Sequence, residues 1–119
     1  MTGVVLASPR ARGSVIERLK AMGFTPFTSD GAVYNACYLA DPTLLPAYHA
    51  DAPQLPVVGY ISDGAWLHDH AASSLIVTEA GGIATALDGG DLKTSEGPSG
   101  CVMASSRSIH TQLLEAVQN

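Results

Sequence analysis

The stretch DHAASSLIVTEAGGIATALDG, residues 69–89, decides the fold of this chain. An apolar run follows Asp69 and stops at the double glycine Gly81-Gly82. Asp at the start of such a run caps free backbone N–H groups, and Gly is the usual residue after a helix end. We therefore predict a helix from Asp69 to the glycines, followed by a strand and a Gly-rich turn. Its inward-facing residues are expected to be Ala72, Leu75, Ile76 and Ala80.

Strands and helices are predicted to alternate along the rest of the chain. Continuous apolar runs at 3–8 and 101–106 are typical of buried strands, and 24–29 and 55–62 are weaker strand candidates. Helical periodicity recurs at 13–23, 29–41 and 108–119, whereas 44–51 is expected to be another strand. This order predicts one α/β layered domain over 1–119, with a mixed or parallel sheet and flanking helices. For the helix in 29–41 we expect Ser29 or Asp30 as the cap and an inner face made of Val33, Ala36, Cys37 and Ala40. The expected cap of the last helix is Ser105 or Ser106.

The composition restricts the partners of the chain. Its 119 residues are 46% hydrophobic and only 14% charged, which favours a surface partly covered by a second domain or another copy, as in a homo-oligomer. The net charge is −5 without any basic run, so nucleic acid is not expected as a partner. No apolar run approaches the roughly 18 residues of a membrane span, and the order of charges at the N-terminus is wrong for a signal peptide. We expect a cytoplasmic protein in which Cys37 and Cys101 are free buried thiols.

The cluster His68-Asp69-His70 at the start of the predicted helix allows three interpretations. Asp69 is a good helix cap in a protein of any function. It is also a candidate Mg²⁺ ligand, although Mg²⁺ needs several oxygen ligands and one carboxylate does not define a site. A zinc or small-molecule site would use His68 and His70 with His49, but residues at i and i+2 do not share a helix face.

Three segments together carry a family resemblance. GAVYNACYLADPTLLPAY (31–48), DHAASSLIVTEAGGIATALDGG (69–90) and VMASSRSIHTQLLEAV (102–117) resemble the C-terminal half of the inositol monophosphatase family. The resemblance runs from about Val4 to the C-terminus. It implies kinship with magnesium-dependent, lithium-sensitive phosphomonoesterases that act on sugar, inositol or nucleotide phosphates.

The resemblance assigns roles to a few positions. It implies that Asp69 is a metal ligand, that Gly31, Ala32 and Val33 line the substrate, and that Asp51 lies near the carboxylate that binds a substrate hydroxyl. His68 stands where the family has Trp. The family's N-terminal motifs, which supply most metal ligands and the phosphate loop, have no counterpart here, so the Mg²⁺ site is incomplete.

The resemblance leads to one main functional hypothesis and two alternatives. We expect part of a Mg²⁺-dependent phosphatase that is inactive alone and acts on a small phosphorylated metabolite once a complementary N-terminal half is present. One alternative is a non-catalytic domain that mediates self-association or binds a partner or ligand. The other is a zinc or small-molecule binding module built on His49, His68 and His70.

Overall fold

The computed structural model describes residues 3–8, 13–28, 31–65, 67–92 and 99–118, and within these ranges it leaves the side chains of Ala32, Ser99 and residues 63–65 and 67–69 undescribed. Five strands and five helices lie in these ranges. The strands are β1 (Val4–Ala7), β2 (Thr25–Phe27), β3 (Val57–Ala65), β4 (Ile83–Ala86) and β5 (Ser99–Ala104). The helices are α1 (Gly13–Ala21), α2 (Ala32–Ala40), α3 (Leu44–Tyr48), α4 (Leu67–Glu79) and α5 (Arg107–Gln118).

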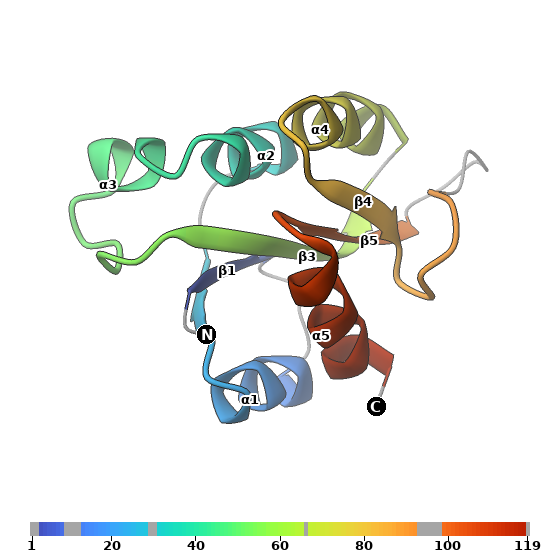
Figure 1. The fold of residues 1–119 in the computed structure, drawn as a ribbon, viewed down its shortest axis with the longest axis horizontal. Helices are drawn as coiled ribbons and strands as arrows, with labels where there is room; N and C mark the ends of the chain where they lie inside the picture. The colour runs from blue at the N-terminus through green and yellow to red at the C-terminus, as the bar shows by residue number, and fades with distance from the viewer. Residues whose placement is uncertain (1–2, 9–12, 29–30, 66, 93–98, 119) are drawn as a thin grey trace.

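The strands form one mixed sheet in the order β2-β1-β3-β5-β4. β1 pairs in parallel with both β2 and β3, whereas β5 runs antiparallel to its neighbours β3 and β4. Helices cover both faces: α2 and α4 lie on one, and α1 and α5 on the other (Figure 1). The predicted α/β class, with a mixed sheet and flanking helices, is confirmed.

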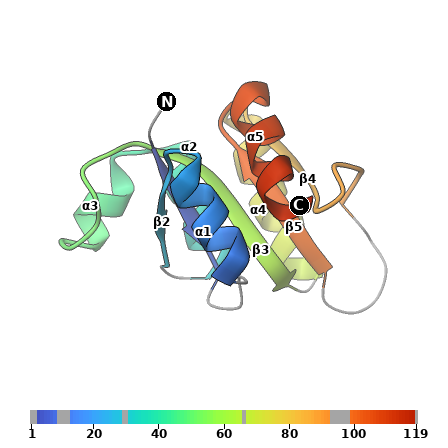
Figure 2. The ribbon, with the colours of Figure 1, turned by 90° about the horizontal axis from the view of Figure 1, so that it is seen from below.

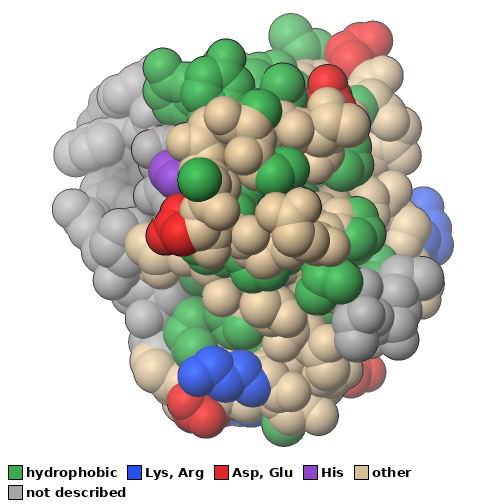
Figure 3. All heavy atoms as spheres, turned by 90° about the vertical axis from the view of Figure 1, so that its left-hand side faces the viewer, with side chains coloured by type: hydrophobic (Ala, Val, Ile, Leu, Met, Phe, Trp, Pro, Cys, Tyr) green, Lys and Arg blue, Asp and Glu red, His purple; other side chains and the backbone are tan. Residues whose placement is uncertain are grey.

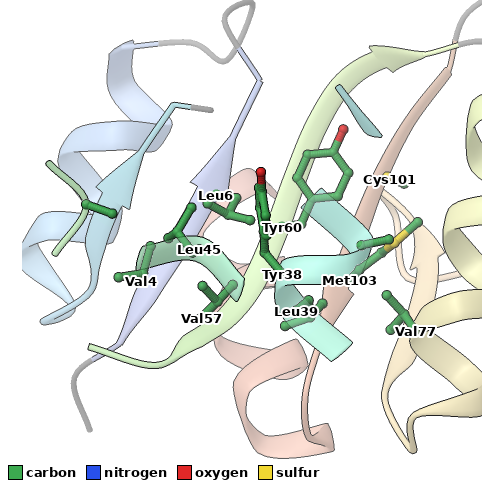
Figure 4. Packing of buried hydrophobic residues seen from close by; sticks show 12 residues of the cluster. Val4, Leu6, Tyr38, Leu39, Leu45, Val57, Tyr60, Val77, Cys101 and Met103 are labelled. Carbon is green, nitrogen blue, oxygen red and sulfur yellow. The ribbon is translucent and has the colours of Figure 1, made fainter. Parts of the chain in front are cut away.

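Each face of the sheet carries its own core. Val4, Leu6, Cys101 and Met103 pack toward α2, α3 and α4, together with Tyr38, Leu45 and Val77 from those helices (Figure 4). On the opposite face, Val5, Val102 and Ala104 pack against α1 and α5. Because β1 and β5 are covered on both faces, they need the continuous apolar runs from which they were predicted.

The prediction of a strand at 44–51 is wrong, because residues Leu44–Tyr48 form the short helix α3. Pro46 lies in the first turn, where a missing backbone N–H costs the helix nothing. Leu45 is completely buried against the core of the α2–α4 face, and the N–H of His49 closes the last turn on the carbonyl of Leu45 at 2.8 Å. A five-residue helix has little intrinsic stability, so the burial of Leu45 holds it.

The inward face predicted for α4 is wrong for Ala72, Leu75 and Ala80, whereas Ile76 is partly buried and packs against the core as predicted. His70, Ser73 and Val77 are the buried side chains, whereas Leu75 is 60% exposed and Ala72 and Ala80 are exposed. Small and apolar residues surround α4 on every side, so their periodicity does not single out the buried face. α4 packs against α2 as well as against β4 and β5, and its inward side carries the short side chain of Ser73.

The buried face of α2 also differs from the predicted one. Asn35, Ala36, Tyr38 and Leu39 are buried, whereas Val33, which we expected inside, is exposed. The cap of α2 also differs: Gly31 is the N-cap and makes no side-chain cap hydrogen bond, while the expected caps Ser29 and Asp30 lie outside the described residues. At α5 the prediction is confirmed, since Ser106 Oγ accepts a hydrogen bond from the N–H of Ile109 at 3.3 Å.

The double glycine ends α4 as predicted. Gly81 has φ +90°, a left-handed conformation that favours glycine, and the N–H of Gly82 reaches the carbonyl of Val77 at 2.9 Å. A Cβ on Gly82 would lie 2.6 Å from the carbonyl oxygen of Ala104 and 2.7 Å from Val77 Cγ1. The close approach of the helix end to β5 therefore requires glycine at this position.

Gly82→Ala is expected to lower the free energy of unfolding by about 1–3 kcal/mol, because the added methyl group meets the backbone of β5. Gly13→Ala is the control, since a Cβ there meets no atom within 4 Å, and it should change stability by less than about 0.5 kcal/mol. Chemical denaturation of both variants measures the difference. Equal denaturation midpoints would contradict the close approach.

Candidate functional site

The carboxyl ends of the parallel strands lie at one edge of the sheet. β1, β2 and β3 point the same way, and β4 shares their direction because both β3 and β4 run antiparallel to β5. The arrowheads of β2 and β3 accordingly lie at the same end in Figure 2. α1, α2 and α4 each follow one of the three parallel strands, so their amino-terminal ends come to this edge.

The connections leave this edge toward opposite faces. α1 joins β1 to β2 on one face, whereas α2 and α3 join β2 to β3 on the other (Figure 1). The edge between β1 and β3 is therefore a topological switch point, which is where ligands bind in open α/β sheets.

The start of α2 offers backbone N–H groups at this edge. Gly31, at φ −74° and ψ 176°, is exposed, and its carbonyl accepts the first helical hydrogen bond from Asn35 N–H at 3.0 Å. Val33, in the first turn, is also exposed. Free N–H groups and the positive end of the helix dipole make such a terminus favourable for an anion. The side chain of Ala32 lies outside those described.

The start of α4 lies beside it, because α4 packs along α2. α4 begins at Leu67, so Asp69 lies inside its first turn instead of preceding it as a cap. The backbone of Gly31–Val33 and of Asp69 therefore lies at the same edge of the sheet. The side chains of His68 and Asp69 lie outside those described, and their predicted roles stay predictions.

Two polar side chains of α4 that follow Asp69 in the sequence are buried. His70 and Ser73, one helical turn apart, are both almost inaccessible to solvent. The hydroxyl of Ser73 has no hydrogen-bond partner in the described part of the chain. Ser73 was not among the residues predicted on this face of α4, where Ala72 was expected.

His49 and Asp51 belong to a different part of the fold. His49 follows α3 and lies edge-on to Phe27 and Tyr38, with ring centroids 5.8 and 6.0 Å apart. Asp51 is exposed in the connection from α3 to the amino end of β3. Within the ranges that the structure describes, no three His, Cys, Asp or Glu side chains are grouped to hold a metal ion. The zinc set and the role of Asp51 stay predictions.

The two cysteines are free thiols, as predicted. Cys101 is buried in β5, and burial raises the pKa of its thiol from 9.0 to about 12. Such a thiol stays protonated and inert, so Cys101 is a core residue. Cys37 is only partly buried, although we expected it on the inner face of α2.

The comparison with protein families decides the kinship. The model of the inositol monophosphatase family matches residues 55–119, which is more than half of the chain. The chain belongs to the inositol monophosphatase family. The match covers β3, the start of α4 and everything that follows, including the quoted stretch 69–89. No curated protein sequence matches the chain.

Solved structures share its fold. An inositol monophosphatase from Anabaena superposes with a TM-score of 0.72 at 21% identity, and one from Thermotoga maritima with 0.75 at 20% identity. Inositol monophosphatase II from Staphylococcus aureus gives 0.72 at 16% identity. These superpositions cover 98%, 98% and 95% of this chain but only 43%, 40% and 40% of the respective relatives. The chain therefore spans about two fifths of their length.

None of the helices in the described ranges has the length and apolar character that a bilayer crossing requires.

Ser73→Ala is expected to raise the free energy of unfolding by about 1 kcal/mol relative to Ser74→Ala, because it removes a buried hydroxyl without a partner. Both changes replace Ser by Ala inside α4, so their helix-propensity effects cancel. Ser74 is the control because it is only partly buried and its hydroxyl bonds to the carbonyl of Ala71. Thermal and urea unfolding measure the difference. A Ser73→Ala variant less stable than Ser74→Ala would reveal a partner for the hydroxyl.

Proposed function

We propose that this chain supplies the C-terminal part of the active site of a phosphomonoesterase. The observation that carries the proposal is the convergence of the starts of α2 and α4 at the switch point of the sheet, in a chain of the inositol monophosphatase family. Free N–H groups at the start of α2 suit a phosphate or another anionic part of a substrate. Sugar, inositol and nucleotide phosphates are the expected substrate class.

The fit of Mg²⁺ to this chain is partial. The described side chains do not group into a metal site, and Asp69 in the first turn of α4 is the single ligand that we assign to it. Mg²⁺ needs several oxygen ligands, so the remaining carboxylates would come from a complementary part that completes the site. When bound in such phosphatases, the metal polarises the phosphate and activates a water molecule.

The proposal gives this chain's own residues limited tasks. The backbone of Gly31–Val33 would bind and orient the substrate, and Asp69 would hold the metal against it. Asp51 has no task in this proposal, because it lies in the connection that leads to the amino end of β3 and not at the edge where α2 and α4 begin. The relatives are more than twice as long as this chain, so the chain alone is expected to show no turnover of phosphate monoesters.

A chimera tests this role. Replacing the matching C-terminal part of the Thermotoga maritima enzyme by this chain should give Mg²⁺-dependent, lithium-sensitive hydrolysis of small phosphate monoesters. Asp69→Asn in the chimera should reduce kcat/KM at least about a hundredfold, because a metal ligand is lost.

Glu79→Gln is the matched control, since it removes the same charge at the other, exposed end of α4. Its kcat/KM should stay within about twofold of the unsubstituted chimera. A chimera that folds cooperatively but hydrolyses nothing, or an Asp69→Asn chimera with full activity, would refute the proposal.

A second candidate role is self-association, supported by large apolar side chains on the surface of the α2–α4 layer. Val33 and Tyr34 on α2 and Leu75 on α4 are exposed, and the two helices pack side by side. Figure 3 shows apolar side chains gathered along the upper part of the molecule, on the side of this layer. Exposed apolar patches of this kind mark interaction surfaces.

Sedimentation velocity tests this role. If the layer mediates a dimer, Leu75→Lys should shift the chain to monomer, because it places a charge within the apolar patch. Leu55→Lys is the control, as Leu55 is exposed on the loop after α3. A monomer at high concentration without either substitution would exclude self-association.

A further inference from the structure

An aromatic groove lies between α2 and α3. It has a volume of about 330 Å³ and is lined by Tyr34, Tyr38, Tyr48 and His49. Tyr38 is only 2% exposed and forms the floor, whereas Tyr34 and Tyr48 are 60% and 69% exposed and form the walls. The rings of Tyr38 and Tyr48 are tilted by 42° with centroids 6.4 Å apart. Two exposed tyrosine rings, those of Tyr34 and Tyr48, are therefore available to a ligand.

The groove is held in place by the core beneath it. Tyr38 belongs to the buried cluster of the α2–α4 face, where Figure 4 shows it among Leu6, Leu45 and Tyr60. The buried Leu45 fixes α3, and the ring of His49 packs edge-on against Tyr38 and Phe27. Only the walls are free to adjust, so little conformational entropy is lost when a ligand enters.

The part of the chain that forms the groove is acidic. Residues 21–92 contain no Lys or Arg but eight Asp or Glu residues. The described basic side chains, Arg18 and Lys20 on α1 and Arg107 at the start of α5, lie on the opposite face of the sheet (Figure 1). Among the described side chains that Figure 3 colours, Lys and Arg lie toward the lower and right-hand margins.

Two exposed carboxylates, Asp41 and Asp51, flank the groove residues in the chain. Asp41 accepts hydrogen bonds from Thr43 Oγ1 at 2.7 Å and from Thr43 N–H at 3.1 Å. Both bonds lower the pKa of Asp41, and the bond from the Thr43 hydroxyl has the larger effect. The carboxylate of Asp41 is therefore ionised at neutral pH. The segment that forms the groove thus carries carboxylates next to its aromatic residues in the chain and no Lys or Arg.

We propose that this groove binds a small organic cation of the alkylammonium class. The faces of Tyr rings carry negative electrostatic potential and attract such a cation, most strongly when several rings surround it. The carboxylates of Asp41 and Asp51, which are close to the groove residues in the chain, add a longer-range attraction to a cation and repel an anion. The groove is open, and a neutral apolar ligand would bury little surface there. This inference does not depend on the proposed phosphatase role.

Binding of choline and of its neutral isostere 3,3-dimethylbutan-1-ol tests the inference. The two probes have nearly the same shape and differ in the charge of the head group. Titration followed by NMR of the tyrosine ring protons should show saturable shifts with choline, at least about tenfold tighter than with the neutral isostere. The affinity for choline should fall as salt is added, because the surrounding charges are screened.

Substitutions of Tyr48 test whether its ring face, and not merely an apolar surface, contributes to choline binding. Tyr48→Leu should weaken choline binding at least about fivefold, since it keeps an apolar wall but removes one ring face. Tyr48→Phe should retain most of the affinity, and Leu55→Ala, which lies in the loop before β3 and does not line the groove, should leave it unchanged. Tyr48 is largely exposed, so the variants should fold, and circular dichroism checks this.

Three outcomes would overturn the inference. The first is equal affinity for choline and the neutral isostere, which would make the groove merely apolar. The second is the absence of saturable shifts up to about 100 mM choline, well beyond the millimolar range of weak sites. The third is unchanged choline affinity in a folded Tyr48→Leu variant, which would place any binding outside the groove.

Discussion

The burial of the central strands on both faces is the constraint on which the rest of the structure depends. β1 and β5 are almost wholly inaccessible, so each must be covered by helices from above and below. Parallel strands require crossover connections, and these place α1 on one face and α2 on the other. The switch point between β1 and β3 follows directly, because the two crossovers leave the sheet in opposite directions.

The packing of α2 against α4 has a second consequence. It brings the start of α2 and the first turn of α4 to the same edge, although Gly31 and Asp69 are 38 positions apart in the sequence. Leu75, Val33 and Tyr34 are exposed on this helix pair, whereas the polar residues Ser73 on α4 and Asn35 on α2 are buried. The candidate substrate edge and the exposed apolar layer thus arise from one helix pair.

α3 gives this chain a feature that the sheet alone would not produce. Its burial of Leu45 places Tyr48 and His49 beside α2, and the aromatic groove results. The aromatic residues of 34–49 were visible in the sequence, but their convergence was not. Recognising it required knowing that 44–48 is a helix anchored at one residue, whereas a strand would have carried these side chains elsewhere.

Strong, continuous or well-terminated patterns were readable from the sequence. The apolar runs of β1 and β5, the Gly81-Gly82 end of α4 and the Ser106 cap of α5 were predicted because burial on both faces and free helix ends impose them locally. The sequence also determined the fold class and, through 69–89, the family resemblance. These features depend on residues close together in the chain.

Only the tertiary structure decided which face of α2 and of α4 is buried, that 44–48 is helical, and that Tyr34, Tyr38 and Tyr48 share a groove. Apolar residues occur on all sides of α4, so its orientation depends on how closely α2 and the sheet approach it. The helix α3 is too short to be stable alone and exists because Leu45 enters a core built from distant residues. Long-range packing selects among local alternatives of nearly equal free energy, and the sequence of a single segment does not contain that choice.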